Sequence, residues 1–238
     1  MAETIIVTSN ASAHPYYPTD LPMADFVPNQ TGSVVLVGKF CVIWSSVLVA
    51  AHFIIKNVRP NTPKSNYLVA MWFTLCGSIH LFFEGYFSLN SLSNLASKQD
   101  VFGQLWKEYS LSDSRYLTQD SFLIPMETLT AFIWGPMSFA CAYCIIMEHP
   151  LRWALQIIIS VGQLYGTILY FGTCILAELV SQISFCRPEA LYYWFYYFHF
   201  NAWWLAIPSY LIWQSACAST AAIAKVQATQ ETGKKKSQ

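Results

Sequence analysis

Charged side chains are scarce in this sequence. Only 11% of its 238 residues are Asp, Glu, Lys or Arg, whereas a typical soluble domain has about 25%. Hydrophobic residues make up 55% of the chain, and its formal net charge is zero. This composition predicts a polytopic membrane protein, and the absence of excess positive charge argues against a nucleic-acid partner.

The sequence also lacks two other features. The amino end has no basic segment ahead of an apolar core, so no cleavable signal peptide is predicted. No internal repeat is visible, which counts against the inverted-repeat transporters.

Five apolar runs are each long enough to cross a hydrocarbon core of about 30 Å. They cover residues 33–56, 67–89, 122–147, 153–177 and 191–217. We therefore predict an all-α fold, a bundle of five transmembrane helices with a long lumenal loop between the second and third. Residues 1–32 are predicted to be an irregular arm and residues 218–238 a cytosolic basic tail. The 90–121 connection is interpreted as a binding loop or lid, or as a helix on the lumenal surface, and these readings are compatible.

Lys and Arg are distributed unevenly between the two ends of the predicted bundle. Eight belong to the connections at 56–66 and 148–152 and to the tail, and four belong to the opposite side. This asymmetry predicts a lumenal amino terminus and a cytosolic carboxyl terminus.

Lys235 and Lys236, fourth and third from the end, match a dilysine retrieval signal of the endoplasmic reticulum. A solvated basic tail is the alternative. Asn10 begins a glycosylation sequon on the predicted lumenal side.

Ionisable side chains occur inside the predicted spans. His80 and Glu84 are four residues apart and share one helix face, and Glu127 lies within a later span. A charged side chain at the bilayer centre costs roughly 2.5–3.5 kcal/mol on insertion scales, so such residues suggest function. The pattern predicts proton chemistry inside the membrane. A buried pair that specifies packing, and a hydrogen-bonding anchor at Glu127, are the structural alternatives.

Three further spans have polar or aromatic faces at helical spacing. These faces are Glu127, Thr130 and Trp134; Gln156, Ser160, Gln163, Thr167 and Tyr170; and Tyr197, Asn201, Trp204 and Pro208. Together with the His80 face they are predicted to line one apolar pocket with a few convergent polar groups. Helix packing is the alternative for each face. One histidine and two carboxyls could bind a metal ion in principle, but an aromatic pocket favours a cationic intermediate, so no metal is predicted.

Several stretches resemble the emopamil-binding protein family of sterol 8,7-isomerases. They include IHLFFEGYF (79–87), QLWKEYSLSDSRY (104–116), METLTAFIWGP (126–136) and YYWFYYFHFNAWWLAIP (192–208). The resemblance implies an enzyme of the endoplasmic reticulum membrane that moves the ring-B double bond of a sterol from position 8(9) to 7(8). The reaction passes through a tertiary carbocation and needs no redox cofactor.

The resemblance also implies residue roles. It assigns proton donation to His80 with Glu84, proton removal to Glu127, and contact with the cation to Trp204. We therefore predict catalytic roles for His80, Glu84, Glu127 and Trp204, and substrate binding by Thr130, Asn201, Tyr197, Trp134, Gln163 and Tyr116. The implied partners are a sterol substrate, cationic amphiphilic inhibitors and the lipid bilayer, and a homodimer is left open.

Two other functions compete with the isomerase. A non-catalytic protein that binds or transports sterols and cationic amphiphiles would use the same scaffold, but it would not need both an acid and a base. A proton-coupled transporter would also use buried carboxyls, and the missing repeat counts against it.

Overall fold

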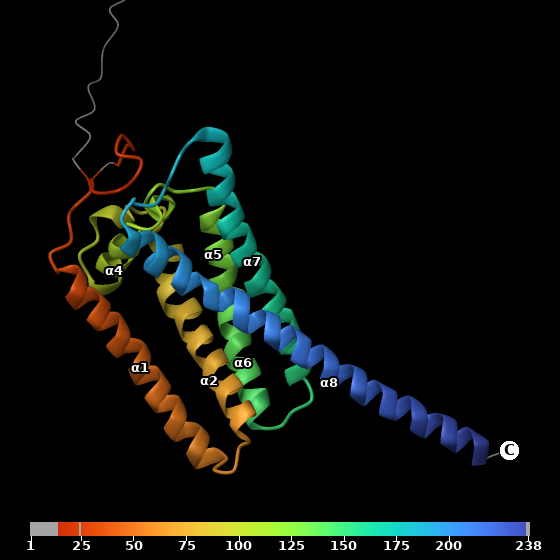
Figure 1. Ribbon diagram of the computed structural model, residues 1–238. Coiled ribbons are helices and arrows are strands. Elements are labelled where there is room, and N and C mark those ends of the chain that lie inside the picture. Colours follow the sequence, from red (N-terminus) through yellow and green to blue (C-terminus); the bar gives the residue numbers. More distant parts are fainter. Residues whose placement is uncertain (1–13, 24, 237–238) are drawn as a thin grey trace, which may run out of the picture.

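The computed structural model describes residues 14–23 and 25–236, with side chains to residue 233. Every regular element in this part of the chain is a helix (Figure 1), so the all-α prediction is confirmed. Asn10 and the dilysine side chains of Lys235 and Lys236 lie outside the described residues.

Four helical rods are long and apolar enough to cross a membrane. The first is α1 (Ser33–Val58). The second, Lys64–Asn90, joins α2 (Lys64–Ser78), η1 (Ile79–Glu84) and α3 (Gly85–Asn90). The third, Leu123–Ile146, joins α5 (Leu123–Leu129), η4 (Thr130–Trp134) and α6 (Gly135–Ile146). The fourth is α7 (Arg152–Ser181). These rods agree with four of the predicted spans and indicate a multi-pass membrane protein.

The fifth predicted span, 191–217, is helical but is not among these four apolar rods. It consists of η5 (Leu191–His199) and the beginning of α8 (Phe200–Lys236). Its Tyr, Trp and Asn residues and Pro208 lower its mean hydropathy below that of the other spans. A five-span count therefore stays a prediction. The helix does not end at residue 217, and α8 continues out of the bundle (Figure 1).

Three segments of these rods are π-helical. η1 contains His80 and Glu84, η4 contains Thr130 and Trp134, and η5 contains Tyr197. π-helical turns are rare, and they occur frequently at functional sites because the wider turn changes which side chains share a face. Their positions therefore mark the region of the bundle where a site is expected.

Gly135 allows two of the π-helical rods to approach closely. A Cβ atom at this position would lie 3.0 Å from the backbone nitrogen of Leu81 and 3.3 Å from its Cα. Any larger residue would push η4 away from η1. The close approach brings Glu84 and Glu127, on neighbouring rods, to the same interior region.

One end of the bundle, here called the arm face, is covered by two segments. Of residues 14–23 and 25–32, none is in a helix or strand. The second segment, between α3 and α5, contains η2 (Leu95–Ser97), α4 (Val101–Tyr109) and η3 (Ser114–Leu117). The opposite end, the turn face, carries the short connections 59–63 and 147–151.

Trp106 fixes α4 over the bundle interior. Its ring stacks on Phe83 with centroids 4.5 Å apart, and its indole N–H donates to the Phe83 carbonyl at 2.9 Å. The aspartate before the helix, Asp100, caps it by accepting from the backbone N–H groups of Phe102 and Gly103. The connection therefore contains a helix packed over the interior, and its role as a binding loop or lid stays a prediction.

The arm is fastened to α4 by hydrogen bonds. The Tyr16 hydroxyl donates to the Lys107 carbonyl at 3.1 Å, and Lys107 Nζ donates to the Val27 carbonyl at 2.7 Å. Asn29 donates to the Gln104 carbonyl at 3.0 Å. Residues from the start of the chain thus hold the cover in place.

Candidate active site

A cavity lies between the rods below α4. Its polar lining comes from all parts of the bundle and comprises His80, Glu84, Glu108, Tyr109, Tyr116, Glu127, Thr130, Gln163, Thr167, Tyr170, Tyr196 and Asn201. The rest of the lining is mainly apolar or aromatic and includes Phe83, Trp106 and Trp204. An apolar cavity with a few convergent polar groups is the usual form of a site for an apolar ligand.

His80 is held between two polar side chains. Its Nδ1 lies 2.8 Å from Glu84 Oε2, and its Nε2 lies 3.0 Å from Gln163 Nε2. As the Gln163 amide is oriented, its N–H donates to Nε2, so the imidazole proton resides on Nδ1 and is donated to Glu84. Rotation of the amide would instead offer Oε1, which has no hydrogen-bond partner among the described residues, to a protonated Nε2. Gln163 can therefore serve both protonation states of His80.

Glu127 is the second carboxyl of the cavity and is 6% exposed. The hydroxyl of Tyr116, in η3, donates to its Oε1 at 2.8 Å. Burial, and then the negative charge of Glu127, raise the pKa of Tyr116 well above its usual value, so Tyr116 remains a donor. Glu84 and Glu127 thus face one cavity and have different hydrogen-bond partners. This difference suits one carboxyl to proton donation and the other to proton removal.

Trp204 and Asn201 complete this end of the cavity from α8. The Trp204 ring lies 6.2 Å from the His80 ring and 5.4 Å from the Trp72 ring, centroid to centroid. Asn201 Nδ2 donates to the Tyr109 hydroxyl at 2.9 Å and to the Tyr197 carbonyl at 2.6 Å. The face of an indole ring beside a histidine and two carboxyls could stabilise a bound cation.

Two glutamines in the polar row on α7 have different partners. Gln163 reaches His80, whereas the Gln156 amide donates to the Leu211 carbonyl and to the Gln214 side chain of α8. Gln156 therefore holds two helices together, and Gln163 belongs to the site. Thr130 lines the cavity, but its hydroxyl donates to the Met126 carbonyl in its own helix.

Two of the predicted substrate-binding residues are not in the cavity lining. Trp134 packs over Gly162 on α7, where an added Cβ would lie 2.7 Å from its ring. Tyr197 lines a smaller pocket beside Cys174 and Cys186 instead. The other eight predicted residues all line the main cavity: His80, Glu84, Glu127, Trp204, Thr130, Asn201, Gln163 and Tyr116. Their catalytic and binding roles stay predictions.

Three polar lining residues were missed by the sequence reasoning. These are Glu108 and Tyr109 on α4 and Tyr196 on η5. Glu108 and Tyr109 fall within the WKEY string that carries the family resemblance, which was the available signal. Nothing in the string shows that Lys107 points to the arm and Glu108 to the cavity.

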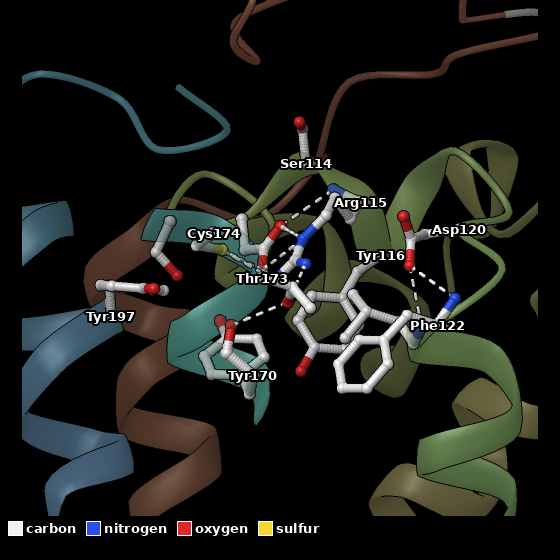
Figure 2. A network of polar contacts seen from close by, with 12 residues as sticks. Ser114, Arg115, Tyr116, Asp120, Phe122, Tyr170, Thr173, Cys174 and Tyr197 are labelled. Carbon is white, nitrogen blue, oxygen red and sulfur yellow. Dashed lines mark hydrogen bonds and ion pairs between the residues drawn. The ribbon is translucent and has the colours of Figure 1, made fainter. Parts of the chain in front are cut away.

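The loop that holds Tyr116 contains a buried ion pair, and its arginine joins the loop to α7 by hydrogen bonds (Figure 2). The Arg115 guanidinium contacts Asp113 at 2.7 Å and also donates to Thr173 Oγ1 at 2.8 Å and Cys174 Sγ at 2.7 Å. Desolvation lowers the pKa of Arg115, but the hydrogen bonds and charge of Asp113 outweigh it and raise the pKa. Arg115 therefore stays charged and fixes η3, and with it Tyr116, in place.

Comparison with known proteins shows which family this chain belongs to. The family model described as EXPERA, the expanded EBP superfamily, matches residues 101–215. A mouse protein named 3-beta-hydroxysteroid-Delta(8),Delta(7)-isomerase is 40% identical over 210 residues, covering 87% of this chain and 89% of the mouse protein. The chain belongs to the emopamil-binding protein family. An Arabidopsis thaliana protein named as a probable isomerase of the same kind is 36% identical over 226 residues, covering 94% and 97% of the two chains.

The emopamil-binding protein family also includes relatives with other names. A protoglabretal synthase of Citrus sinensis is 31% identical over 169 residues, covering 69% of this chain and 78% of its own. The sequence-based assignment to the emopamil-binding protein family is therefore confirmed, and the substrate must be argued from the site.

Proposed function

We propose that this protein is a sterol isomerase that moves the ring-B double bond from position 8(9) to position 7(8). The observation that carries the proposal is the pairing of two differently partnered carboxyls in one apolar cavity: Glu84 with His80, and Glu127 with Tyr116. The names of the mouse and Arabidopsis relatives support the same reaction.

The mechanism begins with proton donation. His80, hydrogen-bonded to Glu84, delivers a proton to C9 of the substrate, and the electrons of the 8(9) double bond form the new C9–H bond. This leaves a tertiary cation at C8. Glu127 then removes a proton from C7, and the electrons of that C–H bond form the 7(8) double bond. One proton enters and one leaves, so the reaction needs no oxidant or reductant.

The surroundings lower the barrier by stabilising the cation. Trp204 presents an aromatic ring next to His80, and a desolvated cation–π contact is worth about 2 kcal/mol or more. The same geometry suits a lipophilic amine, whose ammonium group would occupy the place of the cation. Cationic amphiphiles are therefore proposed as inhibitors.

We further propose that the protein resides in the endoplasmic reticulum membrane, with a lumenal amino terminus and a cytosolic carboxyl terminus. The Lys and Arg distribution supports this orientation.

Incubation of the purified protein with an 8(9)-unsaturated sterol in deuterated water tests the function. We expect 7(8)-unsaturated product carrying one deuterium at C9, detected by mass spectrometry and NMR. Recovery of unlabelled 8(9)-sterol, with binding shown in the same sample, would mean that the protein binds sterols without isomerising them.

A further inference from the structure

A second polar group in the cavity lies apart from the acid–base residues. Glu108, on α4, is 6% exposed and lines the cavity near the start of α1. The lining of the same cavity includes the apolar side chains of Val37, Phe40 and Phe200. The mechanism above gives Glu108 no task, yet an acidic side chain in such surroundings is costly unless it is hydrogen-bonded.

Both hydrogen-bond partners of Glu108 are hydroxyl groups. Ser33 Oγ donates to Oε2 at 3.0 Å, and the Tyr196 hydroxyl donates to Oε1 at 3.1 Å. The adjacent Lys107 does not pair with it, because Lys107 Nζ donates to the Val27 carbonyl. A carboxylate can accept about four hydrogen bonds, so Glu108 retains capacity for one more hydroxyl from the cavity.

The position of Glu108 fits the shape of the proposed substrate. Tyr196, its partner, lies five residues before Asn201 and eight before Trp204, which is about two helical turns from the cation-binding end. A 3β-hydroxysterol is rigid and apolar, with its hydroxyl on ring A, next to the reacting ring B. Glu108 is an acceptor in the same cavity that the acid–base groups do not use, so this hydroxyl would find a partner there.

We propose that Glu108 accepts a hydrogen bond from the 3β-hydroxyl of the substrate and so sets the position of ring B against His80 and Glu127. This inference rests on the proposed isomerase function. Glu108 is then a specificity-determining residue, because a site built to hydrogen-bond a hydroxyl rejects analogues that cannot donate.

Three substrates test the proposal: an 8(9)-sterol with a 3β-hydroxyl, its 3-deoxy analogue and its 3-ketone. For the wild type we expect kcat/KM to fall at least about 100-fold without the hydroxyl, since such sites discriminate strongly. Glu108→Gln offers an amide N–H that can donate to a ketone. The ratio of kcat/KM for ketone over hydroxysterol should therefore rise at least about tenfold in this variant.

Two controls separate recognition from structure. Ser33→Ala and Tyr196→Phe each remove one existing partner of Glu108 but keep its carboxylate, so both should retain the preference for the hydroxysterol. If Glu108→Gln lowers activity on all three substrates by the same factor, Glu108 is only structural and the proposal is wrong. If the wild type isomerises all three equally, the proposal is also wrong although the isomerase function stands. Failure to isomerise any of them would reject the function itself.

Discussion

His80 and Glu127, which we propose as the proton donor and the proton acceptor, have different neighbours. His80 has a carboxyl on one nitrogen and an amide on the other, so it can lose and regain a proton without losing its hydrogen bonds. Glu127 accepts a hydrogen bond from the Tyr116 hydroxyl. At the residue scale, the proposed proton donor and the proposed proton acceptor thus differ in their hydrogen-bond partners.

The first prediction removes each ionisable group while keeping its size. Glu84→Gln and Glu127→Gln should each reduce isomerase turnover at least about 100-fold, the usual scale for general acid–base help. Measurement of product formed per amount of membrane protein checks this. Glu148→Gln is the control, since Glu148 is an exposed partner of Arg59 and should keep full activity. Near-wild-type turnover in either cavity variant would remove that residue from the mechanism.

The second prediction concerns the cation. A protonated lipophilic amine should bind at least about tenfold more tightly than its carbon isostere, which corresponds to about 1.4 kcal/mol. Trp204→Leu should narrow this difference, because the cation–π attraction is lost while burial remains. Competition binding against a labelled amine measures both effects. Equal binding of amine and isostere to the wild type would show that the cavity recognises only the apolar volume of the ligand and not its charge.

At the scale of the elements, the π-helical turns explain which residues were placed correctly by sequence reasoning. Alignment at α-helical spacing grouped Tyr197 with Asn201 and Thr130 with Trp134. Within a π-helical turn the hydrogen bonds join residues five apart, so the turn is wider, and Tyr196 rather than Tyr197 lines the cavity with Asn201. Glu127 and Thr130 both line the cavity, and their roles stay predictions. No residue pattern in the sequence announces a π-helical turn, so this error could not have been avoided.

The third prediction tests helix contact at two glycines one turn apart on α7. Gly162→Ala would place a Cβ 2.7 Å from the Trp134 ring and should destabilise the protein by about 1–3 kcal/mol, the usual cost of overpacking. Gly166→Ala meets only Met126 Sδ at 3.9 Å and should be tolerated. Thermal unfolding in detergent compares the two variants. Equal unfolding temperatures would show that Trp134 moves aside without cost.

The fourth prediction is a pH dependence of the attachment between the arm and α4. Burial lowers the pKa of Lys107 to about 8, although the charge of Asp100 raises it. Between about 8 and the ordinary lysine value the unfolded chain binds more protons than the folded one, so this lysine destabilises the fold less as pH rises. The unfolding temperature of the wild type relative to Lys107→Met should therefore increase across this window. A difference that stays constant or falls would contradict the assignment.

At the scale of the whole molecule, the sequence predicted the rods but not the contacts between the arm and α4. Apolar runs alone located four spans to within a few residues of the observed helices, because length and hydropathy are local properties. The contact between Tyr16 and Lys107 joins residues 91 positions apart. No local pattern encodes such a pairing, and so neither the docking of the arm nor the inward direction of Glu108 was predictable.

The fifth prediction concerns orientation in the membrane. A chemical tag after Gln238 should react from the cytosolic side, and a tag near Asn10 only after the lumenal side is opened, as the Lys and Arg asymmetry requires. Site-specific labelling of sealed microsomes measures this. Labelling of both ends from one side would mean an even number of spans, and η5 with α8 would then not cross the bilayer.

The long α8 has a consequence for how the end of the chain is displayed. From residue 217 to residue 236 it continues as helix, and its side chains between 221 and 233 are exposed. Nineteen residues of helix measure about 28 Å, whereas a flexible chain of the same length has an average reach of roughly 24 Å. The helix therefore gains little distance. What it changes is direction, because a rigid helix confines its end to one narrow region, whereas a flexible chain of the same length would sample a hemisphere.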